Sequence, residues 1–263
     1  MKLAGRYDVA RLGVCLGFAM SVVGNACAQT RITNASASAN AAQIDFNGGP
    51  TFTFNGLSGT VGATLAPPHV NIEARASLGT SSNGASRSYQ ETAGATLIWW
   101  EPEWRLGASL GHQHTDRPGS DVNVTNLHGY GVWFPSESVT LSAKAGGFSG
   151  TRDGKYAGVA INWYLTEDLA LFGAFDGTSF DANFQESDWT ASVQWLPTRQ
   201  LPVSLALGVT HSQISGRFDA RATAAFVGVR LFFNRSGETS LRGRERTGPT
   251  GWPSTFGPQG LGF

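Results

Sequence analysis

The chain has 263 residues, of which 41% are hydrophobic and 14% charged, with 34 glycines, eight tryptophans and a formal net charge of zero. Soluble domains carry about 25% charged residues, so the composition excludes a disordered chain, a coiled coil and a basic nucleic-acid-binding protein. The length fits one large domain or two small ones.

The first 28 residues have the pattern of a secretory signal peptide. Three cationic residues precede an apolar run over 12–23, and small residues surround the expected cleavage site at Ala28. The run is shorter than the ~20 residues that a transmembrane helix needs. We therefore predict that residues 1–28 are removed on export. A lipoprotein signal ending at Cys27 is the alternative, but the preceding residues 24–26 lack the leucine of such a signal.

Cleavage there would leave a chain without cysteine, because the two cysteines are Cys15 and Cys27. The mature chain would then have no disulfide, no cysteine nucleophile and no thiolate metal site. Removing three of the 19 cationic residues and one of the 19 anionic residues changes the net charge to −2. This small charge implies no electrostatic partner.

Downstream, apolar and polar residues alternate with a period of two. Residues 70–78 place an apolar residue at every even position, and the same alternation returns over 189–195 and 203–209. This period is typical of strands with two different faces. After residue 28 there is no apolar, uncharged run of about 20 residues, which excludes a helical membrane span.

Tight turns divide these strands at intervals of about 31 to 34 residues. They lie at 67–68, 101–103, 135–137, 167–168 and 197–199. Longer polar breaks lie between them at 80–87, 116–121, 150–153, 181–186 and 215–219. Short turns at one end and longer loops at the other are typical of outer-membrane barrels, whose short turns face the periplasm. Helical repeats of similar period are the alternative, but the intervals lack runs of helix formers at helical spacing.

The turns predict an all-β fold, a transmembrane antiparallel up-and-down β-barrel of about 12 strands. The five short turns join ten strands, and a first strand within 44–55 and a last within 222–233 complete the set. A lipid-facing sheet has no water to satisfy a free edge, so it must close on itself. The expected segments are a signal peptide at 1–28, a flexible periplasmic N-terminus at 29–43, the barrel at 44–234 and a periplasmic tail at 235–263.

Tryptophan placement gives a second signal. Six of the eight tryptophans lie within a few residues of a short turn, joined there by Phe134 and Tyr164. Indole combines an apolar body with a polar N–H, so a ring of tryptophans at one height forms an aromatic girdle at the headgroup boundary. The predicted girdle consists of Trp99, Trp100, Trp104, Trp133, Trp163 and Trp195.

A soluble barrel or sandwich shows the same alternation and is the main alternative fold. Its polar face would meet water and would carry many lysines and glutamates. After residue 28 the chain has only two lysines, Lys144 and Lys155, and the polar positions hold mostly Ser, Thr, Gly, Ala and Asn. Small neutral groups suit a lumen, which leaves the Val, Leu, Ile and Trp face for lipid.

The hairpin Tyr164–Leu169 joins an aromatic strand end to an acidic turn, and the strand Gly228–Phe233 has large apolar residues at alternating positions after a glycine. In these features the chain resembles porin-like outer-membrane β-barrel proteins of Gram-negative bacteria, over residues 44–234. The resemblance implies localisation in the cell outer membrane, contact with outer-membrane lipid and insertion by the barrel-assembly machinery. Phe226 departs from the pattern, because a polar residue is usual there.

Two further departures concern the loops and the tail. A general porin has about 16 strands and a long loop folded into the lumen, whereas this chain has length for about 12 strands and no comparably long loop. The segment 235–263 is rich in Gly, Pro and Arg, so we expect a solvated extension without a packed core. Contact of Arg242, Arg244 and Arg246 with lipid phosphates or a periplasmic partner is the alternative.

Charged residues in the polar register of the strands are expected to line the pore. They are Glu73, Arg75, Arg105, Lys144, Asp176, Asp188 and Arg230. Charges of both signs either line an aqueous passage or pair across a closed interior. Twelve strands enclose more room than the roughly eight whose interior is just filled by side chains. We therefore expect a porin-like channel for passive diffusion of small hydrophilic solutes, without a cofactor, a metal or enzymatic chemistry.

Two other functions are open. His112, His114 and Asp116 lie near the loop end of one strand, and their spacing puts both imidazoles on one face, where they would allow metal ligation or acid–base chemistry. An outer-membrane barrel enzyme acting on lipid is therefore one alternative. No serine is placed as an obvious nucleophile, and both histidines have the outward register, which favours a surface pair. A structural or recognition barrel without transport is the other function, and the short loops would give it a small binding area.

Overall fold

The computed structural model describes residues 31–46, 51–65, 69–82, 87–117, 119–181, 184–216, 219–232 and 238–247. The predicted signal peptide, residues 1–28, lies outside these residues. Within the described part of the chain, no helix is both long enough and apolar enough to cross a membrane.

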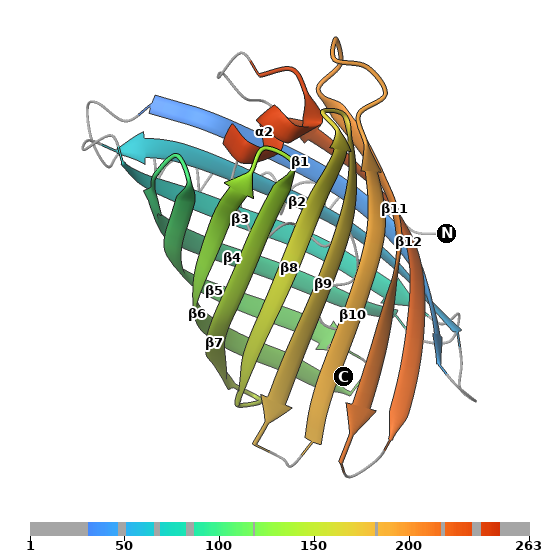
Figure 1. The fold of residues 1–263 in the computed structure, drawn as a ribbon. Coiled ribbons are helices and arrows are strands. Elements are labelled where there is room, and N and C mark those ends of the chain that lie inside the picture. Colours follow the sequence, from blue (N-terminus) through green and yellow to red (C-terminus); the bar gives the residue numbers. More distant parts are fainter. Residues whose placement is uncertain are drawn as a thin grey trace, which may run out of the picture.

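The described chain consists almost entirely of antiparallel strands. They are β1 Arg31–Phe46, β2 Thr51–Leu65, β3 Val70–Ser82, β4 Arg87–Trp100, β5 Trp104–Arg117, β6 Ser120–Ser136, β7 Val139–Gly150, β8 Gly154–Thr166, β9 Leu169–Phe180, β10 Phe184–Trp195, β11 Val203–Ser215 and β12 Ala220–Phe232. Each strand pairs with its neighbours in sequence, which confirms the predicted all-β, antiparallel up-and-down sheet. The sheet closes into a barrel (Figure 1), because β1 pairs with β12 from Ser36 opposite Phe232 to Phe46 opposite Ala222.

The barrel begins earlier than the sequence predicts. The expected flexible N-terminus at 29–43 is wrong, because β1 starts at Arg31 and pairs with both β2 and β12. The first strand also lies mostly before the predicted window 44–55, part of which belongs to β2. Much of β1 alternates alanine with serine or asparagine. This alternation has little hydropathy contrast, so backbone hydrogen bonds to two neighbours hold the strand in place.

The two faces of the barrel carry different side chains. On β11 the outward residues Leu207 and Val209 are exposed, whereas the alternate residues Ser204 and Thr210 are buried. The exposed large hydrophobic residues are Leu97, Trp99, Trp104, Leu106, Leu110, Leu127, Trp133, Val159, Ile161, Trp163, Leu165, Trp189, Val193, Trp195, Leu201, Leu205, Leu207, Val209, Val227, Val229 and Leu231. Most of the apolar surface therefore faces outward, the reverse of a soluble barrel or sandwich.

The inner face is less uniformly small and neutral than the sequence predicts. Besides hydroxyl groups it carries the large side chains of Ile98, Phe172 and Phe226, all of which are buried. Gly208 lies opposite Phe226 in the pairing of β11 with β12. A Cβ on Gly208 would collide with the Phe226 ring. The absence of a side chain at Gly208 thus leaves room for the ring of Phe226, which occupies an inward position that is usually polar.

A short helix, α2 Leu241–Thr247, lies across the mouth of the barrel at the upper end of Figure 1. Its first residue is completely buried and packs with Tyr164, Ala170, Leu196 and Phe232. The predicted solvated tail without a packed core is therefore wrong for the described residues 238–247. A single buried leucine, Leu241, anchors a segment whose Gly/Pro/Arg composition favours disorder.

A charge on the outer face distinguishes a lipid environment from water. We expect Leu207→Arg, at a side chain that is 67% exposed, to lower the free energy of unfolding in phospholipid vesicles. The loss should be about 2–4 kcal/mol, because arginine near the bilayer midplane costs that much on a barrel. Urea unfolding followed by tryptophan fluorescence measures it. The depth control, His211→Arg, lies nearer the loops and should cost about 0–1 kcal/mol. A change within about 0.5 kcal/mol for Leu207→Arg would place this face in water.

Candidate functional site

The barrel interior contains most of the charged residues that the sequence places there. Glu73 and Arg105 are each only 2% exposed. The other described members of the predicted set are partly buried in the inner register, and they are Lys144, Asp176, Asp188 and Arg230. Arg75 also belongs to the predicted set, but its side chain is not among those that the structure describes. The interior is therefore the candidate site, and its charges form two groups at different heights.

The first group is an ion pair that reaches across a strand. Lys144 Nζ on β7 lies 2.7 Å from Asp176 Oδ1 on β9, although β8 lies between them. Gly158 of β8 is opposite both residues. A Cβ at this position would collide with Asp176 Oδ1 and come within 3.1 Å of Lys144 Cε. The absence of a side chain on Gly158 therefore permits the ion pair.

Two further carboxyl groups lie beside this pair. Asp176 is directly opposite Asp188 of β10. Glu186 precedes Asp188 by two residues in the inner register, is 8% exposed, and has one carboxyl oxygen without a hydrogen-bond partner. With three carboxyl groups against the ammonium of Lys144, this part of the inner wall is acidic. We call Asp176, Glu186 and Asp188 the acidic wall.

The sequence did not identify Glu186, because the polar break at 181–186 was assigned to a loop. In the structure β10 begins at Phe184, so Glu186 belongs to the strand. Residues two apart on a strand share a face. The spacing of Glu186 from Asp188 is therefore the signal that identifies it once the strand is extended.

The second group combines cations with aromatic rings at the short-turn end. The Arg105 guanidinium lies 3.5 Å from the centroid of the Trp100 ring and 5.0 Å from that of Phe134. Arg246 of α2 lies 4.9 Å from the Phe134 centroid and 5.9 Å from that of Tyr164. A cation over an aromatic face is attracted by the ring quadrupole. We call this series from Trp100 to Tyr164 the cation–aromatic stack, and it joins α2 to the barrel wall.

The stack corrects part of the predicted girdle. Consecutive strand residues point to opposite faces, so the exposed Trp99 places Trp100 on the inner face against Arg105. Phe134 and Tyr164, which the sequence grouped with the girdle, also lie on the inner face, and Tyr164 is buried. The other five members are exposed on the outer face beside the short turns, and they are Trp99, Trp104, Trp133, Trp163 and Trp195.

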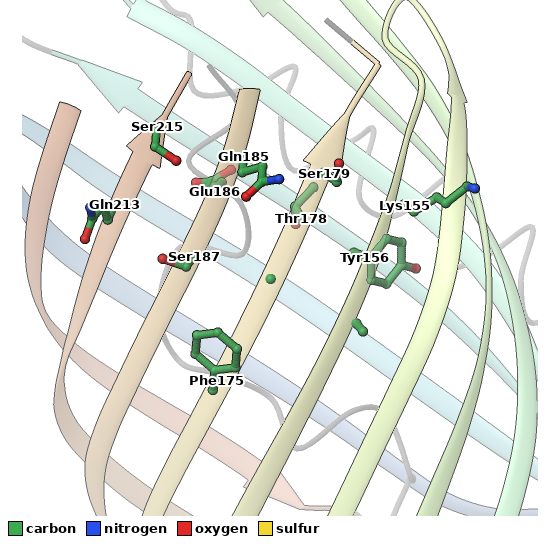
Figure 2. Close-up of a pocket in the computed structure, with 12 residues that line it drawn as sticks. Lys155, Tyr156, Phe175, Thr178, Ser179, Gln185, Glu186, Ser187, Gln213 and Ser215 are labelled. Atoms are coloured by element: carbon green, nitrogen blue, oxygen red, sulfur yellow. The ribbon is translucent and has the colours of Figure 1, made fainter. Parts of the chain in front are cut away.

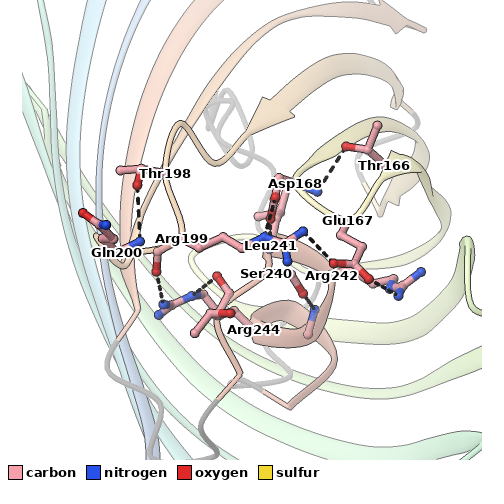
Figure 3. A network of polar contacts seen from close by, with 12 residues as sticks. Thr166, Glu167, Asp168, Thr198, Arg199, Gln200, Ser240, Leu241, Arg242 and Arg244 are labelled. Carbon is pink, nitrogen blue, oxygen red and sulfur yellow. Dashed lines mark hydrogen bonds and ion pairs between the residues drawn. The ribbon is translucent and has the colours of Figure 1, made fainter.

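Ion pairs join α2 to the short turns, and Figure 3 shows their centre. Arg242 lies 3.2 Å from Glu167 and 3.6 Å from Glu137. The Arg242 backbone N–H also donates to the Glu167 carbonyl at 2.9 Å. Arg199, from the turn between β10 and β11, lies 2.6 Å from Glu167 and 2.8 Å from Asp168. The helix is thus part of a polar network that includes three short turns.

Glu245 connects α2 to the inner wall. The Tyr164 hydroxyl donates a hydrogen bond to Glu245 Oε2 at 2.9 Å, and Arg230 Nη1 lies 3.8 Å from Glu245 Oε1. Burial raises the pKa of the Glu245 carboxyl above its ordinary value, an effect that the Arg230 charge and the Tyr164 hydrogen bond oppose. The predicted pore-lining residue Arg230 therefore forms an ion pair with the helix.

At the loop end, β8 to β11 border a concavity of about 560 Å³ (Figure 2). Most of its side chains carry hydroxyl or amide groups, and the labelled residues are Lys155, Tyr156, Phe175, Thr178, Ser179, Gln185, Glu186, Ser187, Gln213 and Ser215. Lys155, Gln185 and Gln213 are exposed in the outward register. The outer surface therefore changes from apolar to polar toward the loops.

The two histidines considered as catalytic groups lie near the loop end of β5. His112 is exposed in the outward register, and its Nδ1 lies 3.1 Å from Thr125 Oγ1. His114 Nδ1 lies 2.8 Å from Asn123 Oδ1. In the described ranges no three metal-binding side chains come together. Each histidine thus has a polar neighbour on the adjacent strand, as expected for a surface pair.

No known family model and no curated protein matches the sequence. Solved structures do match it. The KdgM porin in complex with oligogalacturonate aligns with a TM-score of 0.52 at 10% identity, over 75% of this chain and 99% of that chain. An outer-membrane channel from Pseudomonas putida F1 gives a TM-score of 0.55 at 9% identity, over 77% and 96% of the two chains. The CymD monoaromatic hydrocarbon channel gives 0.51 at 5% identity, over 78% and 89%. The chain therefore has the fold of porin-like outer-membrane β-barrel proteins.

The ion pair across Gly158 can be tested without changing either charge. We expect Gly158→Ala to separate Lys144 from Asp176 and to lower the free energy of unfolding by about 1–3 kcal/mol, because a partly buried charge loses its partner. Urea unfolding in detergent micelles measures the loss. The control is Gly177→Ala, since the nearest atom to a Cβ there is Phe175 Cε1 at 4.0 Å. Equal stability of the two variants would contradict the role assigned to Gly158.

Proposed function

We propose that this protein is a porin-like channel of the bacterial outer membrane through which small hydrophilic solutes diffuse passively. The observation that carries the proposal is the distribution of side chains on a closed sheet. Large apolar residues are exposed on the outer face, whereas the inner face contains the buried charges of Glu73 and Arg105 and buried hydroxyl groups. This distribution suits a barrel with lipid outside and water within.

The outer face supports the membrane location. In this proposal the five exposed tryptophans lie at the periplasmic headgroup boundary, and the short turns beside them lie in the periplasm. Outer-membrane lipid is then the partner of the apolar surface. The barrel-assembly machinery inserts the exported chain, as the family resemblance implies.

The acidic wall gives the lumen a preference for cations. Asp176 and Asp188 are directly opposite each other, with Glu186 beside them and one ammonium group, Lys144, in the same row. Acidic groups along a pore attract cations and disfavour anions. The guanidinium of Arg105 elsewhere in the lumen keeps this preference weak.

The solved channels of similar fold differ in their cargo. KdgM is described in complex with oligogalacturonate, which is a polyanion, and CymD is described as a channel for monoaromatic hydrocarbons. An acidic wall repels a polyanion, and charged and hydroxyl groups along the lumen favour a hydrated solute over a hydrocarbon. We therefore propose small neutral or cationic hydrophilic molecules as the solutes of this channel.

Planar bilayer recordings test the channel function. Because α2 lies across one mouth, both the full-length protein and a chain ending after residue 237 are recorded. Stepwise currents that grow with salt concentration, from either chain, support the channel. Silence of both chains, together with lipid hydrolysis that is lost in His112→Ala or His114→Ala, would indicate an enzyme instead. Silence in both assays would indicate a structural or recognition barrel.

The charge preference gives a further prediction. We expect the double variant Asp176→Asn, Asp188→Asn to lower the potassium-to-chloride permeability ratio by a factor of about five. Two unit charges near the path lower the energy of a passing cation and raise that of an anion by about 0.5 kcal/mol each in a water-filled site, so removing them changes the difference by about 1 kcal/mol, a factor of about five. Reversal potentials across a salt gradient measure the ratio. Asp121→Asn, at an exposed position in the outward register, is the control and should leave it unchanged. An unchanged ratio in the double variant would contradict the acidic wall as the source of selectivity.

A further inference from the structure

We infer that α2 is a plug: when seated it closes the short-turn mouth of the barrel to ions, and the channel opens when the helix leaves its seat. The seat consists of those individual residues of the short turns and of the inner wall that α2 contacts. The inference rests on the proposed channel function, because a plug has a role only where there is a passage.

The contacts of α2 extend around a large part of the mouth. Arg242 pairs with Glu137 in the turn after β6 and with Glu167 in the turn after β8. Arg244 Nη2 donates to the Arg199 carbonyl, in the turn after β10, at 3.5 Å. These three turns follow one another around the rim. A helix of seven residues that reaches all three of them cannot lie along a single strand.

Contacts with the inner wall are found at both ends of this series of turns. Glu245 pairs with Arg230 on β12. In the other direction Arg246 donates to the carbonyls of Ser136 and Val139, which flank the turn after β6. Side chains of α2 therefore meet the wall from β6 round to β12. The helix and its side chains cross the opening through which a solute would pass.

The cation–aromatic stack extends this barrier toward β4. Arg246 lies against Phe134 of β6, the same ring lies against Arg105 of β5, and Arg105 lies over Trp100 of β4. Each neighbouring pair of groups is within 5.0 Å, measured from guanidinium to ring centroid. These large side chains extend the barrier along the wall from β6 to β4.

The seat combines one strong anchor with several weak ones. Leu241 has no exposed surface and packs with Tyr164, Leu196 and Phe232. The ion pairs at the short turns are more accessible, since the side chains of Glu167 and Arg199 are about half exposed. Exposed ion pairs contribute little each and weaken with salt. The helix is thus held by an apolar anchor, by accessible ion pairs at the turns and by the largely buried ion pair of Glu245 with Arg230, without a covalent link.

Release of α2 is expected to be a two-state event. A helix of seven residues is too short to be stable in water by itself. When α2 leaves the seat, it therefore loses its helical structure together with its contacts. Positions between the seated and the released state are not stabilised by either. Two populations, seated and released, follow from this coupling, and single channels should switch between a closed and an open level.

Single-channel recording tests the plug. The chain ending after residue 237 and the full-length variant Leu241→Asp should both be open for a fraction of time at least about tenfold greater than that of the unaltered protein. The unit conductance should match in the two altered chains. Leu201→Asp is the control, because Leu201 is exposed in the neighbouring turn and should leave the open fraction unchanged. An unaltered protein that is open as often as the chain ending after residue 237 would overturn the plug.

A reversible lock makes the test independent of side-chain deletion. The Arg242 backbone nitrogen lies 2.9 Å from the Glu167 carbonyl oxygen, which brings the two residues close enough for a designed disulfide. Glu167→Cys and Arg242→Cys are introduced together into a chain with Cys15→Ser and Cys27→Ser. Oxidation should abolish opening, and a reductant should restore it to a level above that of the unaltered protein. Equal currents before and after oxidation, with the disulfide verified by mass, would overturn the plug.

A measurement without current separates this inference from the channel function. In the same cysteine-free chain, Leu241→Cys should react with a water-soluble maleimide at least about tenfold more slowly than Leu201→Cys. Slow reaction at position 241 shows that the seat exists. If every chain is then silent in the bilayer, including the one ending after residue 237, the channel and its plug are both overturned. Fast reaction at position 241 overturns the seat itself, whatever the currents show.

Discussion

The hydrogen bonds between β1 and β12 join the ends of the described sheet, and the inside and outside of the molecule exist only because of this closure. Every described strand has two neighbours, so the sheet has no edge strand whose backbone N–H and C=O groups would be left unpaired in lipid. The strand that closes the sheet is a weakly patterned one. Its alternating alanine, serine and asparagine residues contribute little hydrophobic contrast, so the pairing depends on backbone groups.

Because the sheet is closed, the two faces that alternate along each strand lie in different environments. In an open sheet, both faces would meet the same surroundings. In the closed barrel, Leu207 is exposed on the outer face, whereas Thr210 is buried in the interior. Closure also places the charges of distant strands on one curved wall. Lys144 reaches Asp176 past Gly158, and Asp188 follows on the next strand. The acidic wall is therefore a property of neighbouring strands, each of which contributes one or two groups. Carboxyl groups placed opposite each other reduce stability, and their presence is easier to understand as a requirement of the proposed passage than of the fold.

The short-turn mouth is organised differently. There the interior contains aromatic rings, guanidinium groups and a helix that follows the last strand. Leu241 supplies the apolar contact, Arg242 joins the turns, and Glu245 faces Arg230 and Tyr164. In the proposed channel the acidic wall and the proposed closing element lie at different heights of the same barrel. Selectivity and opening can then be altered by separate substitutions.

Much of the fold follows from the sequence alone, because strand alternation and turn spacing are local. The positions of β3 to β12, the orientation of the apolar face and the outward exposure of five of the six tryptophans assigned to the girdle were predicted from such patterns. The inward position of Trp100 could also have been predicted, because the residue next to Trp99 on a strand must point to the opposite face. The position of β1, the contact of Lys144 with Asp176 and the seat of α2 were not predictable in this way. They depend on which residues closure brings together across many strands, and no local pattern in Ala-Ser repeats or in an arginine-rich tail encodes a partner. The sequence determines which face of each strand is apolar, whereas tertiary structure decides which charges meet and what lies across the mouth, because those contacts exist only once the sheet has closed.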